Sequence, residues 1–220
     1  MITVHYIGDS TVARNNIHSY PQTGMSQGLQ LYLKEAVRLV SYAKNGRSTK
    51  SFLDEGRFEP VKAAMAPGDF LLIQFGHNDE KPDEARHTDP DTSFRENLLL
   101  FIRAAKAVGA HPVLLTPIAR RLFDADGKFL PGSHGEYPAA MLRAGAEVGV
   151  PVIDLTAATE SWLVETGDEA SKPLFMWPVD NTHLKYEGAV KMAGFVAEGL
   201  KNLGGMYADL LAGPEEGAGK

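Results

Sequence analysis

The chain of 220 residues contains no cysteine. This absence excludes disulfide bonds, thiolate metal sites and a cysteine nucleophile. It does not determine the cellular compartment, because exported proteins can also lack cysteine. No apolar run reaches the roughly 20 residues that a membrane-spanning helix needs, so we expect no membrane association. The N-terminus lacks the basic and apolar segments of a signal peptide. We therefore expect a cytoplasmic protein if this terminus is native, and a secreted one if a signal peptide has been removed.

Basic residues are fewer than acidic ones, with 22 Lys and Arg against 28 Asp and Glu and a net charge of −6. Because nucleic-acid binding needs a basic surface, this balance predicts no nucleic-acid partner, and a polyanionic ligand would need a local basic cluster. The 44% hydrophobic content is ample for one core. We expect a single domain over residues 1–211 and a small, polar, disordered tail over 212–220.

Short apolar runs alternate with longer helical patterns along the whole chain. Strands are expected at 2–7, 37–43, 69–76, 111–118 and 150–155. Helices are expected at 24–36, 57–66, 92–109, 137–149 and 184–204, and a small hairpin at 122–131. This alternation predicts an α/β fold in which a parallel sheet is covered by helices on both faces. In such folds ligands bind beyond the carboxyl ends of the strands.

Polar residues follow the expected strands at that edge. They are Gly8-Asp9-Ser10, Asn45-Gly46-Arg47-Ser48, Gly76-His77-Asn78-Asp79, Arg120-Arg121 and, before the last helix, Asp180-Asn181-Thr182-His183. Cleavage of an ester needs a hydroxyl nucleophile, a base, a carboxylate that orients the base, and donors for the developing oxyanion. This set contains all four kinds of group.

We assign the hydroxyl to Ser10 and the orienting carboxylate and base to Asp180 and His183, whose spacing of three places both side chains on one side of a turn. The Gly46 N–H and the Asn78 amide are the expected oxyanion donors. Simpler roles remain open, because Ser10 is also a good helix cap, His183 can be structural, and Asn78 can form a local turn.

The ordered motifs GDST, NGRS, GHND and DNTH resemble the four blocks of the SGNH (GDSL-like) hydrolase superfamily. The resemblance implies a flavodoxin-like, three-layer α/β/α sandwich around a five-stranded parallel sheet. It also implies that Ser10 is the nucleophile and, through its own N–H, the first oxyanion donor, with Gly46 and Asn78 as the second and third. Asp180 and His183 match the other members of the catalytic triad.

Within that superfamily, GDSTVA, NGRSTKSFLDEGRFE and FGHNDEK are similar to the corresponding blocks of rhamnogalacturonan acetylesterases. The chain departs from them at Gly24-Met25-Ser26, where many members carry Gly-Trp-Gly. The resemblance implies removal of acetyl groups from pectin, with an acetylated pectic polysaccharide or oligosaccharide as the partner. A lipase or thioesterase, an acetylxylan-type esterase and a non-catalytic carbohydrate-binding protein are the alternatives.

A metallophosphoesterase is a further alternative, because His77, Asp79, His87 and Asp89 resemble a metal-ligand set. That family, however, requires Asp-x-His after the first strand, where this chain has Gly-Asp-Ser. We therefore expect no metal and no cofactor, and we expect His77 to be a hydrogen-bonded residue that orients its loop.

The cations Arg47, Lys50, Arg120 and Arg121 lie on the loops at the expected active edge. Arginine pairs well with carboxylates, so these side chains are candidates for binding galacturonate, although ordinary surface charge explains them equally well.

His77, His134, Glu136, Tyr137 and Trp177 are further candidates for contact with a sugar. The apolar MYADLL segment near the C-terminus packs either on the domain or on a partner, so a monomer or a weak homo-oligomer is expected. The acetylated sugar position is left open by the sequence.

Overall fold

The computed structural model describes residues 1–213, and the expected disordered tail lies almost entirely outside the described residues. One parallel sheet contains the strands in the order β2-β1-β3-β4-β5, which is the flavodoxin-like order. The strands are β1 (Ile2–Gly8), β2 (Val37–Ser41), β3 (Phe70–Gln74), β4 (His111–Leu115) and β5 (Val152–Ile153). The expected α/β class and five-stranded parallel sheet are confirmed. The single domain over 1–211 stays a prediction, with which this one sheet is compatible.

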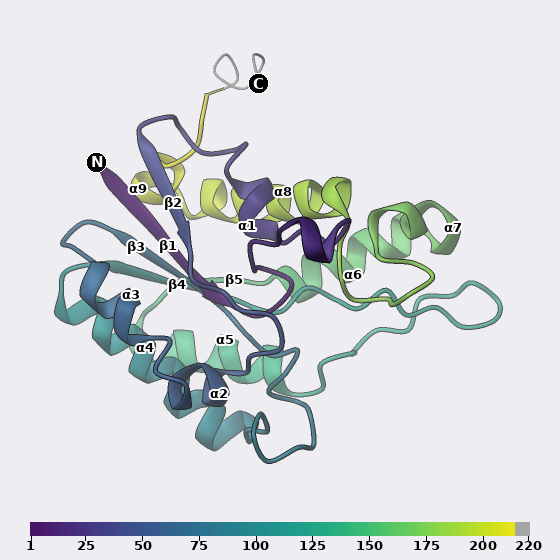
Figure 1. Cartoon of the computed structure of the whole chain (residues 1–220), viewed down its shortest axis with the longest axis horizontal. Coiled ribbons are helices and arrows are strands. Elements are labelled where there is room, and N and C mark those ends of the chain that lie inside the picture. Colours follow the sequence, from purple (N-terminus) through teal and green to yellow (C-terminus); the bar gives the residue numbers. More distant parts are fainter. Residues whose placement is uncertain (214–220) are drawn as a thin grey trace.

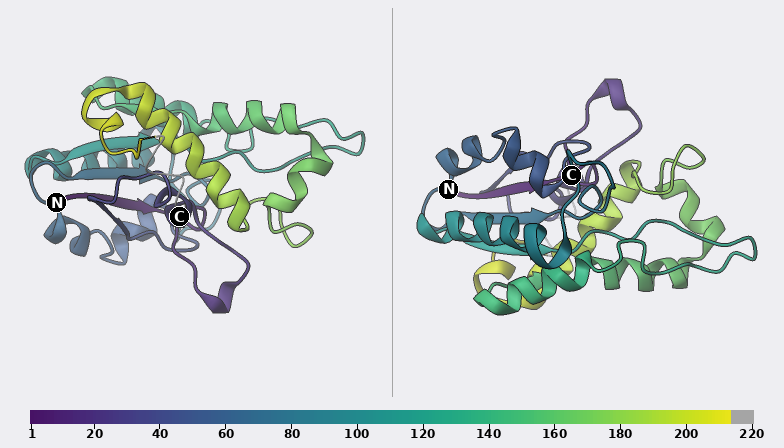
Figure 2. Two further views of the ribbon diagram at one scale, coloured as in Figure 1. Left: turned by 90° about the horizontal axis from the view of Figure 1, so that it is seen from above. Right: turned by 90° about the horizontal axis from the view of Figure 1, so that it is seen from below.

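Helices cover both faces of the sheet, which makes three layers (Figure 1). They are α1 (Met25–Leu29), α2 (Thr49–Asp54), α3 (Glu59–Ala64), α4 (Arg95–Ala107), α5 (Tyr137–Val148), α6 (Leu155–Thr166), α7 (Asp168–Ser171), α8 (Tyr186–Leu203) and α9 (Gly205–Ala208). Helices α1, α8 and α9 lie on one side, and α2, α3, α4 and α5 lie on the other (Figures 1 and 2). None of the helices in the described part of the chain is long and apolar enough to span a membrane.

The sheet is buried on both faces because its strands alternate apolar side chains toward two separate clusters. In β3, Phe70 and Leu72 join the cluster beneath α1 and α8, whereas Leu71 and Ile73 join the cluster beneath α4 and α5. This alternation is what successive residues of a strand produce, and it explains why the run reads as continuously apolar.

One expected helix is shorter in the structure, and the 12-residue helix α6 has no expected counterpart. The helix expected at 24–36 is only α1, because Leu33 forms an antiparallel bridge with Leu211 and the Lys34 N–H donates to Leu210. These long-range contacts replace the helical hydrogen bonds, and they place the buried Leu210 of the MYADLL segment on this chain's own core. The helix α2 was not expected at all. The expected hairpin is present as a bridge between Phe123 and Phe129.

Candidate active site

The candidate residues converge where the carboxyl ends of the parallel strands meet. Ser10 follows β1, Gly46 follows β2, and Asn78 follows β3, so they surround the point at which the strand order reverses direction. Asp180 and His183 come from the segment that precedes α8. The fold thus brings residues near both ends of the chain to one edge of the sheet.

Ser10, His183 and Asp180 form a chain of hydrogen bonds. Ser10 Oγ lies 2.9 Å from His183 Nε2, and His183 Nδ1 lies 2.9 Å from Asp180 Oδ2. A carboxylate only accepts, so Nδ1 carries the ring proton in this arrangement and the Nε2 lone pair faces the serine hydroxyl. The His183 side chain is 31% exposed, which leaves it accessible to a substrate.

Asp180 also holds the loop that carries the histidine. Its Oδ1 accepts the backbone N–H groups of Thr182 at 2.8 Å and of His183 at 2.7 Å. Partial burial raises the pKa of Asp180, but the hydrogen bonds from His183 and Thr182 outweigh burial and leave this pKa below its usual value. The carboxylate is therefore ionised at neutral pH and able to orient the imidazole.

A buried aspartate fixes the turn that presents Ser10. Asp9 Oδ1 accepts from the Thr11 N–H at 2.9 Å and from the Thr11 hydroxyl at 2.8 Å, and the Ala13 N–H donates to Asp9 O. Gly24 packs against this turn, where a Cβ atom would lie 2.1 Å from the carbonyl oxygen of Ala13. Only glycine permits that approach, so the sequence at 24 helps to position the serine.

Three N–H groups are available for an oxyanion. Within residues 1–213, neither the Ser10 N–H nor the Gly46 N–H donates to another protein group. Gly46 has φ +78, a backbone conformation that favours glycine. The Asn78 amide is oriented by Nδ2 donating to Arg47 O at 3.1 Å and by Oδ1 accepting from Arg86, and its second amide hydrogen is left over.

Asp79 is a structural residue that the sequence analysis considered only as a metal ligand. It is buried and accepts from the Thr49 N–H, the Gly76 N–H and the hydroxyls of Thr49 and Thr88. Burial raises the pKa of Asp79 to about 7, against the lowering effect of those hydrogen bonds. It therefore ties the loop after β3 to the start of α2.

The other members of the alternative metal set are also engaged elsewhere. His87 Nδ1 lies 3.1 Å from Lys81 O, and Asp89 caps the π-helical turn before α4. In the part of the chain that the structure describes, no three His, Asp or Glu side chains come together as a metal site.

The model of the GDSL-like Lipase/Acylhydrolase family matches residues 6–189. The chain belongs to this family. It is 41% identical to the rhamnogalacturonan acetylesterase RhgT of Bacillus subtilis, over 97% of this chain and 96% of that protein. Membership in the family makes the chain an acyl hydrolase.

Solved structures show the same fold. The structure of YxiM from Bacillus subtilis matches this GDSL-like hydrolase with a TM-score of 0.82 and 27% identity over 92% of this chain. The chain spans 56% of the length of that protein. An acetylxylan esterase from Geobacillus stearothermophilus matches with a TM-score of 0.66 and 18% identity, over 94% of this chain and 95% of that one.

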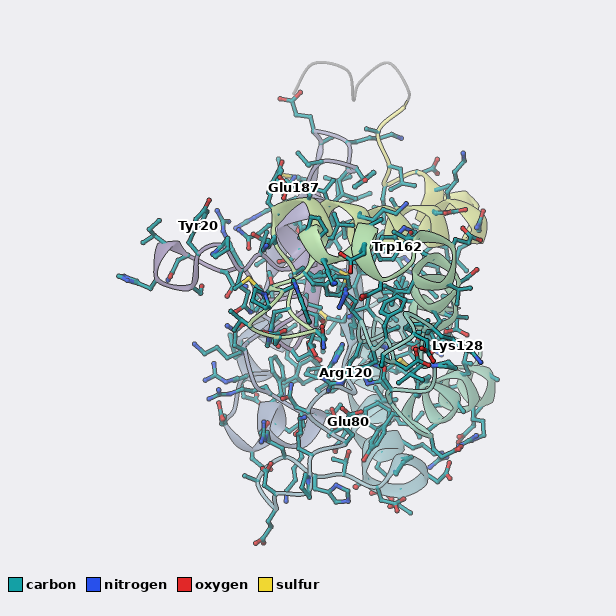
Figure 3. The ribbon with its side chains drawn as sticks, turned by 90° about the vertical axis from the view of Figure 1, so that its right-hand side faces the viewer. Tyr20, Glu80, Arg120, Lys128, Trp162 and Glu187 are labelled. Carbon is teal, nitrogen blue, oxygen red and sulfur yellow. The ribbon has the colours of Figure 1, made fainter. Side chains whose placement is uncertain are left out.

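Two consecutive arginines hold the loop between Asp180 and His183 in this GDSL-like hydrolase. Arg120 donates to the Thr182 hydroxyl at 2.7 Å and pairs with Glu80, beside which it lies in Figure 3. Arg121 donates to Asn181 Oδ1 at 3.0 Å, and its backbone N–H donates to Asn181 O. Arg120 and Arg121 thus hold Thr182 and Asn181, the two residues between Asp180 and His183.

The expected galacturonate cations are mostly occupied by protein groups, and their role in binding a substrate stays a prediction. Arg121 is buried and paired with Asp168, Arg47 is paired with Glu55, and Lys50 donates to a backbone oxygen. Arg120 is paired as described above. A carboxylate that already pairs with an arginine offsets part of its positive charge, which weakens its attraction for a second carboxylate.

Three expected sugar contacts are buried side chains, and their role in binding stays a prediction. His134 is buried, with Glu80 on Nδ1 and Ile118 O on Nε2, so no ring nitrogen is free. Tyr137 is buried and its hydroxyl donates to backbone oxygens.

His77 is buried too, but neither of its ring nitrogens has a hydrogen-bond partner among the described residues, contrary to the expected role. Its ring instead packs edge-on against His134, with centroids 4.4 Å apart. Burial lowers the pKa of His77 well below its usual value, followed by repulsion from nearby cationic groups. His77 is thus a neutral packing residue behind the site.

Trp177 and Glu136 are exposed, which leaves them available to a substrate. Trp177 is 40% exposed and lies close to the loop before α8, although its ring already contacts Arg121 and Lys172. Glu136 stands at the start of α5 and makes no side-chain hydrogen bond to the described residues.

Proposed function

We propose that this GDSL-like hydrolase is an acetylesterase that removes O-acetyl groups from rhamnogalacturonan or its oligosaccharides. The observation that carries the reaction type is the pair of 2.9 Å contacts from Ser10 through His183 to Asp180. The substrate class is supported by the 41% identity to a rhamnogalacturonan acetylesterase over nearly the full length of both chains.

In this proposal Ser10 Oγ attacks the carbonyl carbon of the acetyl group while His183 Nε2 takes the hydroxyl proton. Asp180 holds the imidazole in the required tautomer and stabilises the imidazolium that forms. The tetrahedral intermediate then collapses, its carbon–oxygen bond to the sugar breaks, and His183 gives its proton to the departing sugar oxygen. Water, deprotonated by His183, hydrolyses the acetyl-serine and releases acetate.

The negative charge that develops on the carbonyl oxygen would be held by the N–H groups of Ser10 and Gly46 and by the Asn78 amide. In other acyl hydrolases, loss of one such donor lowers kcat by about 10²- to 10³-fold. The two backbone donors have no other partner in the described part of the chain, so they need no rearrangement to meet the charge.

The test is acetate release from a panel of substrates by the wild-type protein, with the Ser10→Ala variant as the blank. Acetylated rhamnogalacturonan, its trimmed oligosaccharides, acetylated xylan and nitrophenyl esters of increasing acyl length form the panel. We expect the highest kcat/KM on the rhamnogalacturonan substrates and a preference for the acetyl ester among the nitrophenyl esters.

Faster hydrolysis of long acyl esters would favour the lipase or thioesterase alternative instead. Equal or faster release from xylan would remove the pectin assignment while keeping the esterase. A preference for trimmed oligosaccharides over the polymer would support a cytoplasmic role.

A further inference from the structure

The proposed substrate is acidic, and the cations expected to bind it are already paired. Two other cations, Arg14 and Lys44, are exposed on the loops that follow β1 and β2. Neither forms an ion pair or a side-chain hydrogen bond with any residue in 1–213. They are therefore available to an external carboxylate in a protein whose net charge is negative.

Arg14 lies between two polar hollows that together we call the Arg14 groove. One hollow, of about 310 Å³, is lined by Arg14, Ser26, Gln30, Ser41 and Tyr186 among others. The other, of about 140 Å³, is lined by Arg14, Asn15, Asn16, Lys44 and Asn45 among others. Neither lining contains a carboxylate, so no acidic group competes for the two cations.

The walls of the Arg14 groove contain buried polar atoms that lack a protein partner. Ser26 is 5% exposed, and its hydroxyl has no hydrogen-bond partner among residues 1–213. The same holds for Ser41 Oγ in the first hollow and Asn45 Oδ1 in the second. These hydroxyl and amide groups therefore keep hydrogen-bonding capacity that no described residue uses.

Three residues that line the Arg14 groove are close along the chain to candidate active-site residues. Arg14 is four residues after Ser10, and even a fully extended chain of that length spans at most about 14 Å. Asn45 immediately precedes the oxyanion donor Gly46, and Tyr186 is three residues after His183. A polymer with one residue at Ser10 therefore reaches the groove with a neighbouring residue.

A larger hollow of about 570 Å³ between α6 and α8 does not meet these conditions. Asp154, Glu165 and Glu198 line it, and Trp162, labelled in Figure 3, forms part of its wall. Its carboxylates would repel an acidic sugar, so charge rather than size selects the Arg14 groove.

We propose that the Arg14 groove is a subsite for a uronic acid residue of the acetylated substrate. Arg14 and Lys44 would bind the sugar carboxylate, and the hydroxyl and amide groups of the walls would bind its hydroxyls. The exposed Tyr186 ring offers a face to the sugar. This assignment rests on the proposed function, because the uronic acid is part of the substrate proposed above.

The test compares Arg14→Gln, Lys44→Gln and the double variant with the wild type on two substrates. One is an acetylated, uronate-containing oligosaccharide, and the other is the same oligosaccharide with its carboxyl groups reduced to alcohols. We expect each single substitution to lower the kcat/KM ratio of acidic to neutral substrate by about tenfold, mainly through KM, because a charge-assisted hydrogen bond is lost. Arg14→Lys should recover part of that loss.

Arg103→Gln is the matched control, since Arg103 is an exposed, unpaired arginine on α4, on the other side of the sheet. It should leave the ratio at the wild-type value. Raising the ionic strength should lower the ratio for the wild type and not for the double variant. A ratio that Arg14→Gln and Lys44→Gln leave unchanged would overturn the subsite.

A binding measurement separates this result from failure of the proposed function. The unacetylated acidic oligosaccharide is titrated into Ser10→Ala protein with and without Arg14→Gln, by calorimetry. If Ser10→Ala/Arg14→Gln binds the oligosaccharide tenfold more weakly than Ser10→Ala does, the groove is supported even if acetate release fails on every pectic substrate. Equal binding by both proteins refutes the groove even if the wild type releases acetate.

Discussion

Two histidine–aspartate pairs lie at opposite edges of the sheet. At the carboxyl edge, His183 and Asp180 are 2.9 Å apart, and their side chains are 31% and 34% exposed. Toward the amino edge, His5 of β1 and Asp69, which immediately precedes β3, are 3.1 Å apart and almost fully buried. The two pairs contain the same chemical groups at nearly the same separation.

They differ in what the second ring nitrogen meets. His183 Nε2 faces the hydroxyl of Ser10, whereas His5 Nδ1 has no hydrogen-bond partner among the described residues. Asp69 accepts two further backbone N–H groups, from Thr3 and Ala66, so it joins the start of the sheet to the end of α3. A histidine–aspartate pair is therefore a stabilising contact by itself, and only a hydroxyl and access to solvent make it a candidate for catalysis.

Removing the hydroxyl should have the largest effect. In Ser10→Ala, turnover of p-nitrophenyl acetate should fall by about 10⁶-fold, because no nucleophile faces His183. His5→Ala is the matched change at the other pair, and it should keep kcat while lowering Tm. If Ser10→Ala retained near-normal turnover, the catalytic assignment would be wrong.

The second-largest effect is expected when the aspartate of each pair is neutralised, because the two substitutions should change different properties. Asp180→Asn should lower kcat by about 10⁴-fold, as the corresponding change does in serine proteases, because the wrong imidazole tautomer is favoured. Asp69→Asn should instead lower the free energy of unfolding by about 1–3 kcal/mol through its buried hydrogen bonds. Kinetics and urea unfolding of both variants check this, and a loss of kcat in Asp69→Asn would contradict the distinction.

Loosening the loop between Asp180 and His183 should have an intermediate effect on kcat. The His5–Asp69 pair offers no comparable substitution. Arg120→Met removes the hydrogen bond to Thr182, so we expect kcat to fall about 10- to 100-fold with a smaller change in KM, as for other positioning residues. Labelling of Ser10 by a fluorophosphonate should slow in parallel. The surface change Arg143→Met, which breaks only the exposed pair with Asp91, should affect neither rate.

The smallest expected effect is on the pH dependence of stability. Burial raises the pKa of Asp69, but hydrogen bonds from Thr3, Ala66 and His5 outweigh it and leave the pKa below its usual value. The unfolded chain therefore binds this proton at higher pH than the folded chain does. The stabilisation is present above the unfolded pKa of about 4, and it is lost as pH falls through the folded pKa.

Urea unfolding between about pH 2 and pH 7 measures this dependence. Asp69→Asn should reduce the pH dependence of the free energy of unfolding more than Asp180→Asn does. Asp180 is more exposed, so water solvates its ionised form in both the folded and the unfolded chain. An unchanged slope in Asp69→Asn would show that the amino-edge pair contributes no pH-dependent stability.

Three of the site residues could be predicted from the sequence because each follows a recognisable strand. Parallel strands must end at one edge, so Ser10, Gly46 and Asn78 were expected to converge before any coordinate was known. Their catalytic roles stay a prediction, whereas their proximity is observed. The length of α1 was not predictable, because the bridge between Leu33 and Leu211 joins segments that are remote along the chain.

The partners of the expected substrate-binding residues could not be predicted from the sequence, for the same physical reason. Arg120 and Arg121 are adjacent in sequence, yet Arg121 is buried against Asp168, and Arg120 lies beside Glu80 at the loop before α8. His134 and Tyr137 are polar residues near the site whose donors are consumed by backbone oxygens and by Glu80. Arg14 belongs to no motif, and no signal in the sequence distinguishes it from the paired arginines.

By itself, the sequence determined the alternation of strands and helices, the edge at which polar residues gather, and the chemical kinds of group present there. The tertiary structure alone decided which histidine–aspartate pair meets a hydroxyl, which arginines are already neutralised, and which buried hydroxyls are left without a partner. Hydrophobic periodicity is a local property of a chain and can be read along it. Burial and ion pairing depend on groups that are distant in sequence, so they exist only once the chain has folded.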